Sequence, residues 1–84
     1  MRHLFFAYLE AVIELSDGRW CAFEIKLGAN QIDKAAAELV KLRDSIAEAG
    51  GVAPSVLCII CGLSNAAFMR PDGVFVVPIT ALKN

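Results

Sequence analysis

The chain has 84 residues and a net charge of −1, and 57% of its residues are hydrophobic, with a mean hydropathy of +0.57. One domain of this size buries only about 60–65% of its unfolded surface, so the chain has more apolar material than its own core can hide. The composition predicts a single domain, residues 1–84, that forms a homo-oligomer such as a dimer or belongs to a larger protein. The charge excludes nucleic-acid binding driven by overall electrostatics, so any phosphate binding has to be local or carried by a metal.

Three cysteines, Cys21, Cys58 and Cys61, are an odd number in a chain without a signal-peptide cleavage pattern. This usage is typical of free thiols in a reducing, cytoplasmic compartment. Residues 49–69 carry no charge and are numerous enough to cross a membrane, but glycines, a proline and polar residues interrupt them. Only residues 56–61 are continuously apolar there, which favours a buried strand and no membrane span.

The first half of the chain predicts a β-hairpin followed by a helix. Residues 4–15 and 20–27 are rich in aromatic and branched side chains, and Asp17-Gly18 between them is a hairpin turn signal. Asn30 can cap a helix that runs to about residue 49, where Gly50-Gly51 ends it. Apolar residues recur along this helix at the spacing of one buried stripe: Ile32, Ala35, Ala36, Leu39, Leu42 and Ile46.

Three further strands are predicted after the helix. Residues 56–61 are typical of a central strand, because they are apolar throughout. Residues 66–70 and 74–77 are two short strands joined by the turn signal Pro71-Asp72-Gly73. The order β-β-α-β-β-β predicts an α/β fold with the helix on one face of the sheet.

The strand at residues 20–27 contains the most informative motif, Glu24-Ile25-Lys26. Strand side chains alternate between two faces, so Glu24 and Lys26 share one face with Trp20. The opposite face carries Phe23, Ile25 and Leu27. A carboxylate can hold a divalent cation, and a neighbouring lysine can orient water or neutralise phosphoryl charge. The alternative is a solvated strand face on which the two charges form a weak surface pair.

A metal site of this kind needs a second acid. Glu10 is the natural candidate, because pairing across the Asp17-Gly18 turn brings it near Glu24, and Glu14 is the runner-up. The pair Cys58-x-x-Cys61 suggests a redox or zinc site instead, but strand residues three apart point to opposite faces. His3 is the only histidine, so tetrahedral zinc lacks ligands.

Two segments carry a resemblance to a known family. They are AVIELSDGRWCAFEIKLG, residues 11–28, and CGLSNAAFMRPDGVFVVPITALKN, residues 61–84. In sequence and in order they resemble the uncharacterised C-terminal domain of prokaryotic AAA-type ATPases, which is similar to the PD-(D/E)xK restriction-endonuclease-like fold. The resemblance covers nearly all of the chain from Glu10 onward. It implies a truncated restriction-endonuclease-like core, with an ATPase module in full-length relatives.

The resemblance also implies site residues. Glu24 and Lys26 match the (D/E)xK positions, and Glu10 falls where the family usually has an aspartate. Gln31 is a weaker match to a supporting polar residue on the helix. The implied catalytic residues are Glu10, Glu24 and Lys26, with Mg²⁺ or Mn²⁺ held by the two glutamates and DNA or RNA as substrate. Glutamate at position 10 is one methylene longer than aspartate, which alters the metal geometry.

Two functions follow from these observations, and whether the chain is an enzyme stays open. The favoured one is an interaction or regulatory module that retains the fold, has a vestigial metal site and requires no cofactor. The shortage of basic residues on the predicted framework of strands and turns supports it, since Arg19, Lys26 and Arg70 are the only ones and phosphate backbones usually need several. The alternative is a divalent-metal-dependent nuclease acting through Glu10, Glu24 and Lys26.

Overall fold

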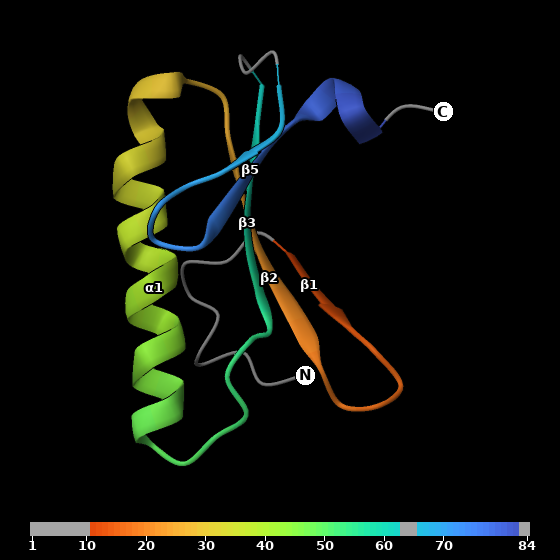
Figure 1. Cartoon of the computed structure of the whole chain (residues 1–84), viewed down its shortest axis with the longest axis vertical. Coiled ribbons are helices and arrows are strands. Elements are labelled where there is room, and N and C mark those ends of the chain that lie inside the picture. The colour runs from red at the N-terminus through yellow and green to blue at the C-terminus, as the bar shows by residue number, and fades with distance from the viewer. Residues whose placement is uncertain (1–10, 63–65, 83–84) are drawn as a thin grey trace.

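The computed structural model describes residues 11–62 and 66–82. Within these residues lie five strands and one α-helix, in the predicted order β-β-α-β-β-β (Figure 1). Their bounds are β1 Ala11–Glu14, β2 Trp20–Lys26, α1 Ile32–Glu48, β3 Val56–Cys61, β4 Phe68–Met69 and β5 Val74–Pro78. The predicted α/β fold class is therefore confirmed. The predicted strand over residues 4–15 is described only from Ala11, and its earlier part lies outside the described residues.

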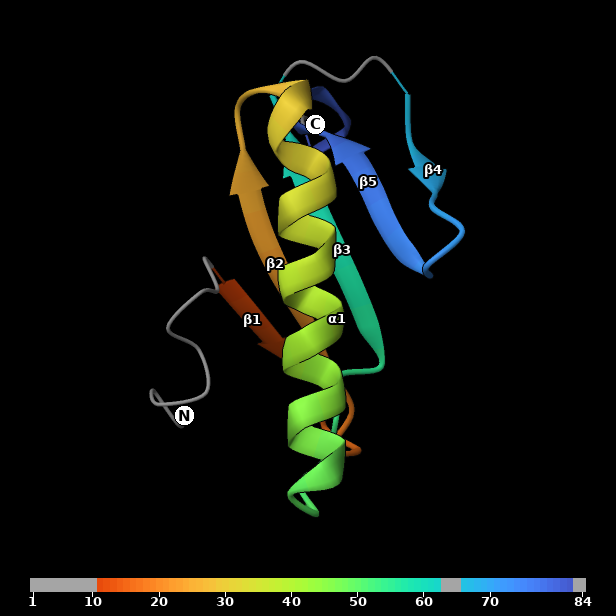
Figure 2. The same ribbon diagram turned by 90° about the vertical axis from the view of Figure 1, so that its left-hand side faces the viewer.

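The five strands form one mixed sheet in the order β1-β2-β3-β5-β4 (Figure 2). The inner strands β2, β3 and β5 are parallel, whereas each outer strand is antiparallel to its neighbour. Parallel neighbours need a crossover, and α1 supplies it between β2 and β3. The carboxyl ends of β2, β3 and β5 consequently lie at one edge of the sheet, where α1 begins.

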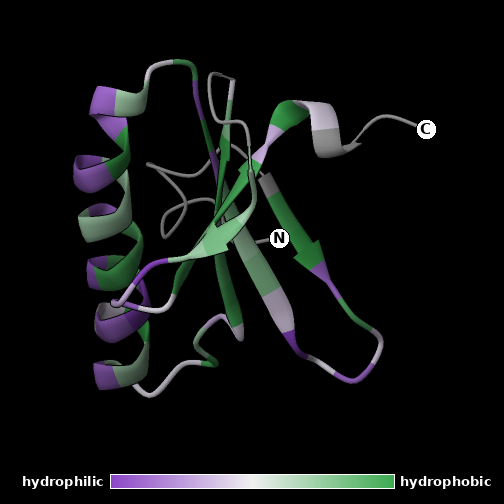
Figure 3. Cartoon of the chain, turned by 45° about the horizontal axis from the view of Figure 1, so that its top comes forward, coloured by the Kyte–Doolittle hydropathy of each residue, from purple (hydrophilic) through white to green (hydrophobic). Residues whose placement is uncertain are grey.

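Helix α1 covers one face of the sheet, and together they make two layers (Figures 1 and 2). The predicted apolar stripe provides the contact: Ala35, Ala36, Leu39 and Ile46 are buried, and Ile32 and Leu42 pack at its margin. The hydrophilic residues of α1 lie on the side away from the sheet (Figure 3). The helix meets Trp20, Ala22, Leu57, Ile59 and Val74 on the sheet. The helical spacing therefore predicted the contact surface of α1 correctly.

The start of α1 differs from the prediction. Asn30 does not cap the helix, because the chain first makes a 3-10 turn at Ala29–Gln31 and Gln31 occupies the N-cap position. The amide nitrogen of Gly28 donates a hydrogen bond of 3.2 Å to Gln31 Oε1, which fastens this turn. The prediction failed because Asn is as common in tight turns as at helix caps, and the sequence does not separate the two.

The end of α1 is the predicted glycine stop. The amide of Gly51 donates to the carbonyl of Ile46 at 2.9 Å, and that of Gly50 donates to Ala47 at 3.1 Å. These two bonds form a Schellman motif, in which the residue after the cap adopts the left-handed conformation. Gly50 has φ +83°, where a side chain is strained.

Substitution of Gly50 by alanine is expected to lower the free energy of unfolding by about 1 kcal/mol, because alanine is strained in the left-handed region. Gly50→Asn is the matched control, since asparagine tolerates this conformation and is expected to lose less. Denaturation with urea measures both. Equal stability of Gly50→Ala and the unsubstituted chain would show that the motif does not constrain the helix end.

The uncharged residues 49–69 contain the predicted strand, which is β3. Ile59 is fully buried at the centre of this strand, between β2 and β5. In residues 11–62 and 66–82 no helix has the length and apolar character that a membrane crossing requires.

Candidate functional site

The acid–x–lysine motif lies on the face of β2 that α1 covers. Trp20, Ala22 and Glu24 alternate along this face and are all buried, and Glu24 is only 2% exposed. In the neighbouring strands, Glu24 is in register with Ile59 of β3, which is in register with Val76 of β5, and both are fully buried. Glu24 is the one buried charged residue among those that the structure describes.

Lys26 lies beside Glu24 on this face. Its Nζ atom is 3.5 Å from Glu24 Oε1, and the exposed fractions of the two side chains are 28% and 3%. The interpretation as a weak pair on a solvated strand face is therefore wrong, because Glu24 is screened from solvent. A buried carboxylate is costly unless cations or hydrogen bonds compensate it, and Lys26 supplies such a cation at the more open end of β2.

The opposite face of β2 is apolar and open. Ile25 is 42% exposed and Leu27, just after the strand, is 73% exposed. The chain thus places the charged face of β2 under the helix and leaves the apolar face half-covered at Cys21 and Phe23 and exposed at Ile25. This arrangement reverses the usual one, in which the polar face of a strand meets solvent.

Of the two candidates for a second acid, the structure describes only Glu14. Glu10 lies outside the described residues, so its pairing with Glu24 stays a prediction. Glu14 is exposed and is in register with Trp20. Trp20 and Glu24 are four residues apart, which corresponds to about 13 Å along a strand. Glu14 is therefore too far away to share a cation with Glu24, and the runner-up is excluded.

Gln31 lies in the turn that precedes α1. Its side chain is exposed, and its Oε1 accepts the hydrogen bond from the amide of Gly28. Its observed contact is with the turn that begins α1, which is a structural role. The weaker match of Gln31 to a supporting catalytic residue therefore gains no support.

An ion pair that the sequence did not predict joins the start of α1 to the β4–β5 turn. Arg70 Nη1 lies 2.8 Å from Asp33 Oδ1, and Arg70 Nε lies 3.2 Å from Asp72 Oδ2. The hydrogen bond from Arg70 to Asp33 raises the pKa of the guanidinium further above its ordinary value. No local pattern signals this pair, since Arg70 and Asp33 are 37 residues apart in the chain. One of the few basic residues near the sheet is thus engaged with carboxylates.

Cys58 and Cys61 do not share a site. Cys58 is in register with Phe23 on the face away from α1, whereas Cys61 is in register with Lys26 on the face under α1, so the predicted opposite orientation is confirmed. All three cysteines are free thiols. Burial, and then the nearby Cys21, raises the pKa of the Cys58 thiol, which keeps it protonated and unreactive. These observations do not favour a thiol-redox protein.

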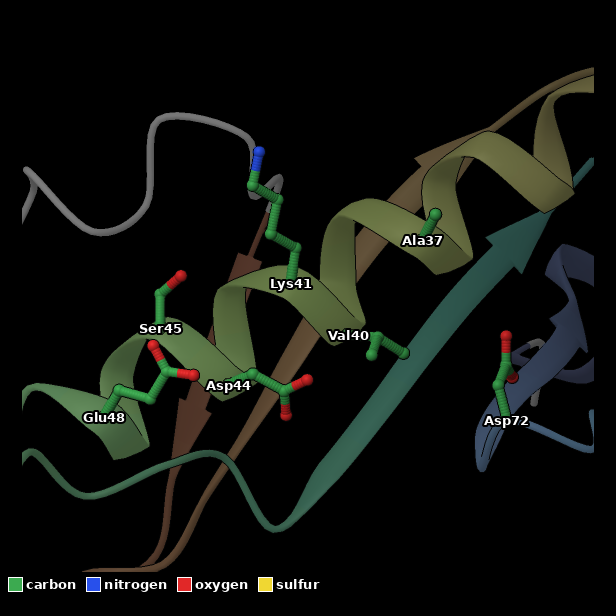
Figure 4. Close-up of a pocket in the computed structure, with 7 residues that line it drawn as sticks. All are labelled: Ala37, Val40, Lys41, Asp44, Ser45, Glu48 and Asp72. Carbon is green, nitrogen blue, oxygen red and sulfur yellow. The ribbon is translucent and has the colours of Figure 1, made fainter.

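A shallow groove runs along the side of α1 that faces the β4–β5 turn (Figure 4). Lys41, Asp44, Ser45 and Glu48 point outward from the helix there, and Asp72 faces them from the β4–β5 turn. The groove contains neither Glu24 nor Lys26, and its carboxylates are solvated. Residues 11–62 and 66–82 hold no group of three or more His, Cys, Asp or Glu side chains that could bind a metal ion.

Comparisons with protein-family models, with curated proteins and with solved structures find no match to this chain. The function of the chain therefore has to be inferred from its own residues and from the geometry of β2.

Proposed function

We propose that this chain is an interaction or regulatory module with a truncated restriction-endonuclease-like core and a vestigial acid–x–lysine site. One observation carries this proposal: Glu24, the acid of the motif, is 2% exposed beneath α1, while Ile25 on the apolar face of the same strand is 42% exposed. A catalytic carboxylate has to reach a metal and a phosphate, whereas an open apolar face is suited to a protein partner.

The family relationship is part of the proposal. It is supported by a hairpin whose second strand carries acid–x–lysine, followed by a crossover helix and a parallel strand. The proposal includes a reducing, cytoplasmic setting, which the three free thiols support. It also includes an ATPase module as a partner in longer relatives.

The alternative is a divalent-metal-dependent nuclease acting on DNA or RNA through Glu10, Glu24 and Lys26, with Mg²⁺ or Mn²⁺ between the two glutamates. The 3.5 Å separation of Lys26 Nζ and Glu24 Oε1 favours it, because the two groups of the motif lie side by side. The antiparallel register of Ala11 with Phe23 also supports it, because the next pair along the two strands would be Glu10 and Glu24.

A cleavage assay separates the two functions. The purified chain is incubated with single-stranded DNA, double-stranded DNA and RNA, with Mg²⁺, with Mn²⁺ or with a chelator. We expect no metal-dependent cleavage, and the same background for the unsubstituted chain, Glu24→Gln and Lys26→Met. A nuclease would instead lose about 100-fold or more of its rate in both variants, because each removes several kcal/mol of transition-state stabilisation.

Glu14→Gln is the matched control, because it removes an exposed carboxylate of the same type that is too far from Glu24 to take part. Circular dichroism checks that every variant is folded. Metal-dependent cleavage that survives Glu14→Gln but disappears in Glu24→Gln would overturn the interaction module and establish the nuclease.

A further inference from the structure

Two of the three cysteines lie on the same face of the sheet, the face turned away from α1. Cys21 alternates along β2 with Trp20 and Ala22, which α1 covers. Cys58 is in register with Phe23, two residues further along β2 than Cys21. Because β2 and β3 are parallel neighbours, the two thiols occupy diagonal positions on one surface (Figure 2).

The register sets the separation of Cys21 and Cys58. Neighbouring strands are about 4.8 Å apart and two residues rise about 6.6 Å, so the two Cα atoms are about 8 Å apart. A disulfide needs Cα atoms within about 7 Å, so this pair cannot close one unless the backbone moves. A metal–thiolate bond is about 2.3 Å long, so a cation between two sulfur atoms holds them about 4.6 Å apart. Cysteine side chains that lean toward each other from these positions can reach that separation.

The electrostatics of Cys58 agree with a short distance between the thiols. Burial, and then the nearby Cys21, raises the pKa of Cys58. A raised pKa protects a thiol from alkylation and oxidation, but a cation removes the proton from the thiol that it binds. Cys58 is 5% exposed and Cys21 is half-buried, so a small ion enters from the side of Cys21.

The surroundings decide which cation two thiols can hold. The other strand residues described on this face are all apolar, and residues 11–62 and 66–82 contain no group of three or more metal-ligating side chains. Zinc needs at least three protein ligands, and hard cations such as Mg²⁺ need oxygen ligands. Cu(I) is a soft cation that prefers thiolates, and it accepts two of them in a linear arrangement.

We propose that Cys21 and Cys58 form a two-coordinate thiolate site for Cu(I). On binding, both S–H bonds break, two Cu–S bonds form and two protons pass to water, while the copper keeps its +1 state. The reducing setting proposed above is one in which copper is present as Cu(I). This inference goes beyond the interaction-module function and does not depend on it.

Competition with bicinchoninate, which forms a coloured complex with Cu(I), tests the site. We expect the reduced chain to withdraw one Cu(I) per molecule from this complex. Cys21→Ser leaves a single thiolate, and its dissociation constant is expected to rise about 100-fold or more, since even changes around a ligand cost about 10–100-fold. Cys61→Ser is the matched control, because it removes a thiol that is fully buried under α1, and it is expected to bind as the unsubstituted chain does.

A further control, His3→Gln, removes the only imidazole in the sequence and is also expected to leave the affinity unchanged. Circular dichroism checks that each variant is folded. The site is overturned if the unsubstituted chain withdraws no Cu(I), or if Cys21→Ser retains its affinity. Loss of binding in Cys61→Ser or His3→Gln while Cys21→Ser binds would also overturn it.

X-ray absorption at the copper edge needs no substitution and decides the case if the serine variants do not fold. The unsubstituted chain loaded with one Cu(I) is expected to show two sulfur neighbours at about 2.2–2.3 Å and no nitrogen or oxygen neighbour. Three sulfur neighbours, or any nitrogen, would overturn the site. Sedimentation of the same sample is expected to give 9.0 kDa, whereas a dimer that forms only with copper would place the ion between two chains and refute the pairing of Cys21 with Cys58.

Discussion

The Lys26→Met variant is expected to lose about 2 kcal/mol of unfolding free energy, whereas Glu24→Met is expected to lose none or to gain about 1–3 kcal/mol. Removing Lys26 withdraws a cation 3.5 Å from a carboxylate that is 3% exposed. Removing the carboxylate instead places an apolar side chain of similar size beside Ile59 and ends the cost of burying a charge. The loss expected for Lys26→Met is smaller than that for a fully buried ion-pair partner, because the Lys26 side chain is 28% exposed.

Urea denaturation at one protein concentration measures both variants and the double variant Glu24→Met/Lys26→Met. Lys34→Met is the matched control, because it removes an exposed lysine from the outer side of α1 and is expected to change stability little. A stable Glu24→Met variant would show that the carboxylate is not retained for stability, which fits a remnant of a metal site. A large loss in Glu24→Met would instead make Glu24 a structural residue.

The Leu39→Ala variant is expected to lose about 3–4 kcal/mol of unfolding free energy, since it leaves a cavity in the layer between α1 and the sheet. Leu39 is 1% exposed and belongs to the buried cluster, together with Ala36 and Trp20. The whole domain is expected to be stable by only about 4–12 kcal/mol, so this loss is a large part of the total.

Leu27→Ala is the matched control for Leu39→Ala, because it removes the same atoms from a side chain that is 73% exposed. It is expected to change the free energy of unfolding by about 0.5 kcal/mol or less. Thermal unfolding followed by circular dichroism measures both variants. Similar losses in the two would contradict the packing of α1 against the Glu24 face of the sheet.

Features that depend on local chemistry could be predicted from the sequence. The Asp17-Gly18 and Pro71-Asp72-Gly73 turns, the glycine stop of α1 and the helical stripe each arise from residues close together in the chain. Alternation along β2 was equally predictable, so the shared face of Glu24 and Lys26 with Trp20 is confirmed. The predicted cap at Asn30 was wrong, because asparagine is favoured both in turns and at helix caps and here lies in a 3-10 turn.

Features that join distant segments could not be predicted. The ion pair of Arg70 with Asp33 and the order of the strands depend on how α1 and the β4–β5 turn pack onto the sheet. The same holds for the separation of Glu14 from Glu24, which follows from the register of β1 with β2. None of these leaves a periodic or local pattern, because each arises only when the chain is folded.

The sequence by itself therefore determined that Glu24 and Lys26 lie together on one face of a strand, with Phe23 and Ile25 on the other. Only the tertiary structure decided which face the helix covers. Hydrophobicity alone favours burying Phe23 and Ile25, but the crossover from β2 through α1 to β3 puts the apolar stripe of the helix over Glu24. A parallel crossover has a fixed hand, and that hand, not the polarity of one strand, selects the covered face.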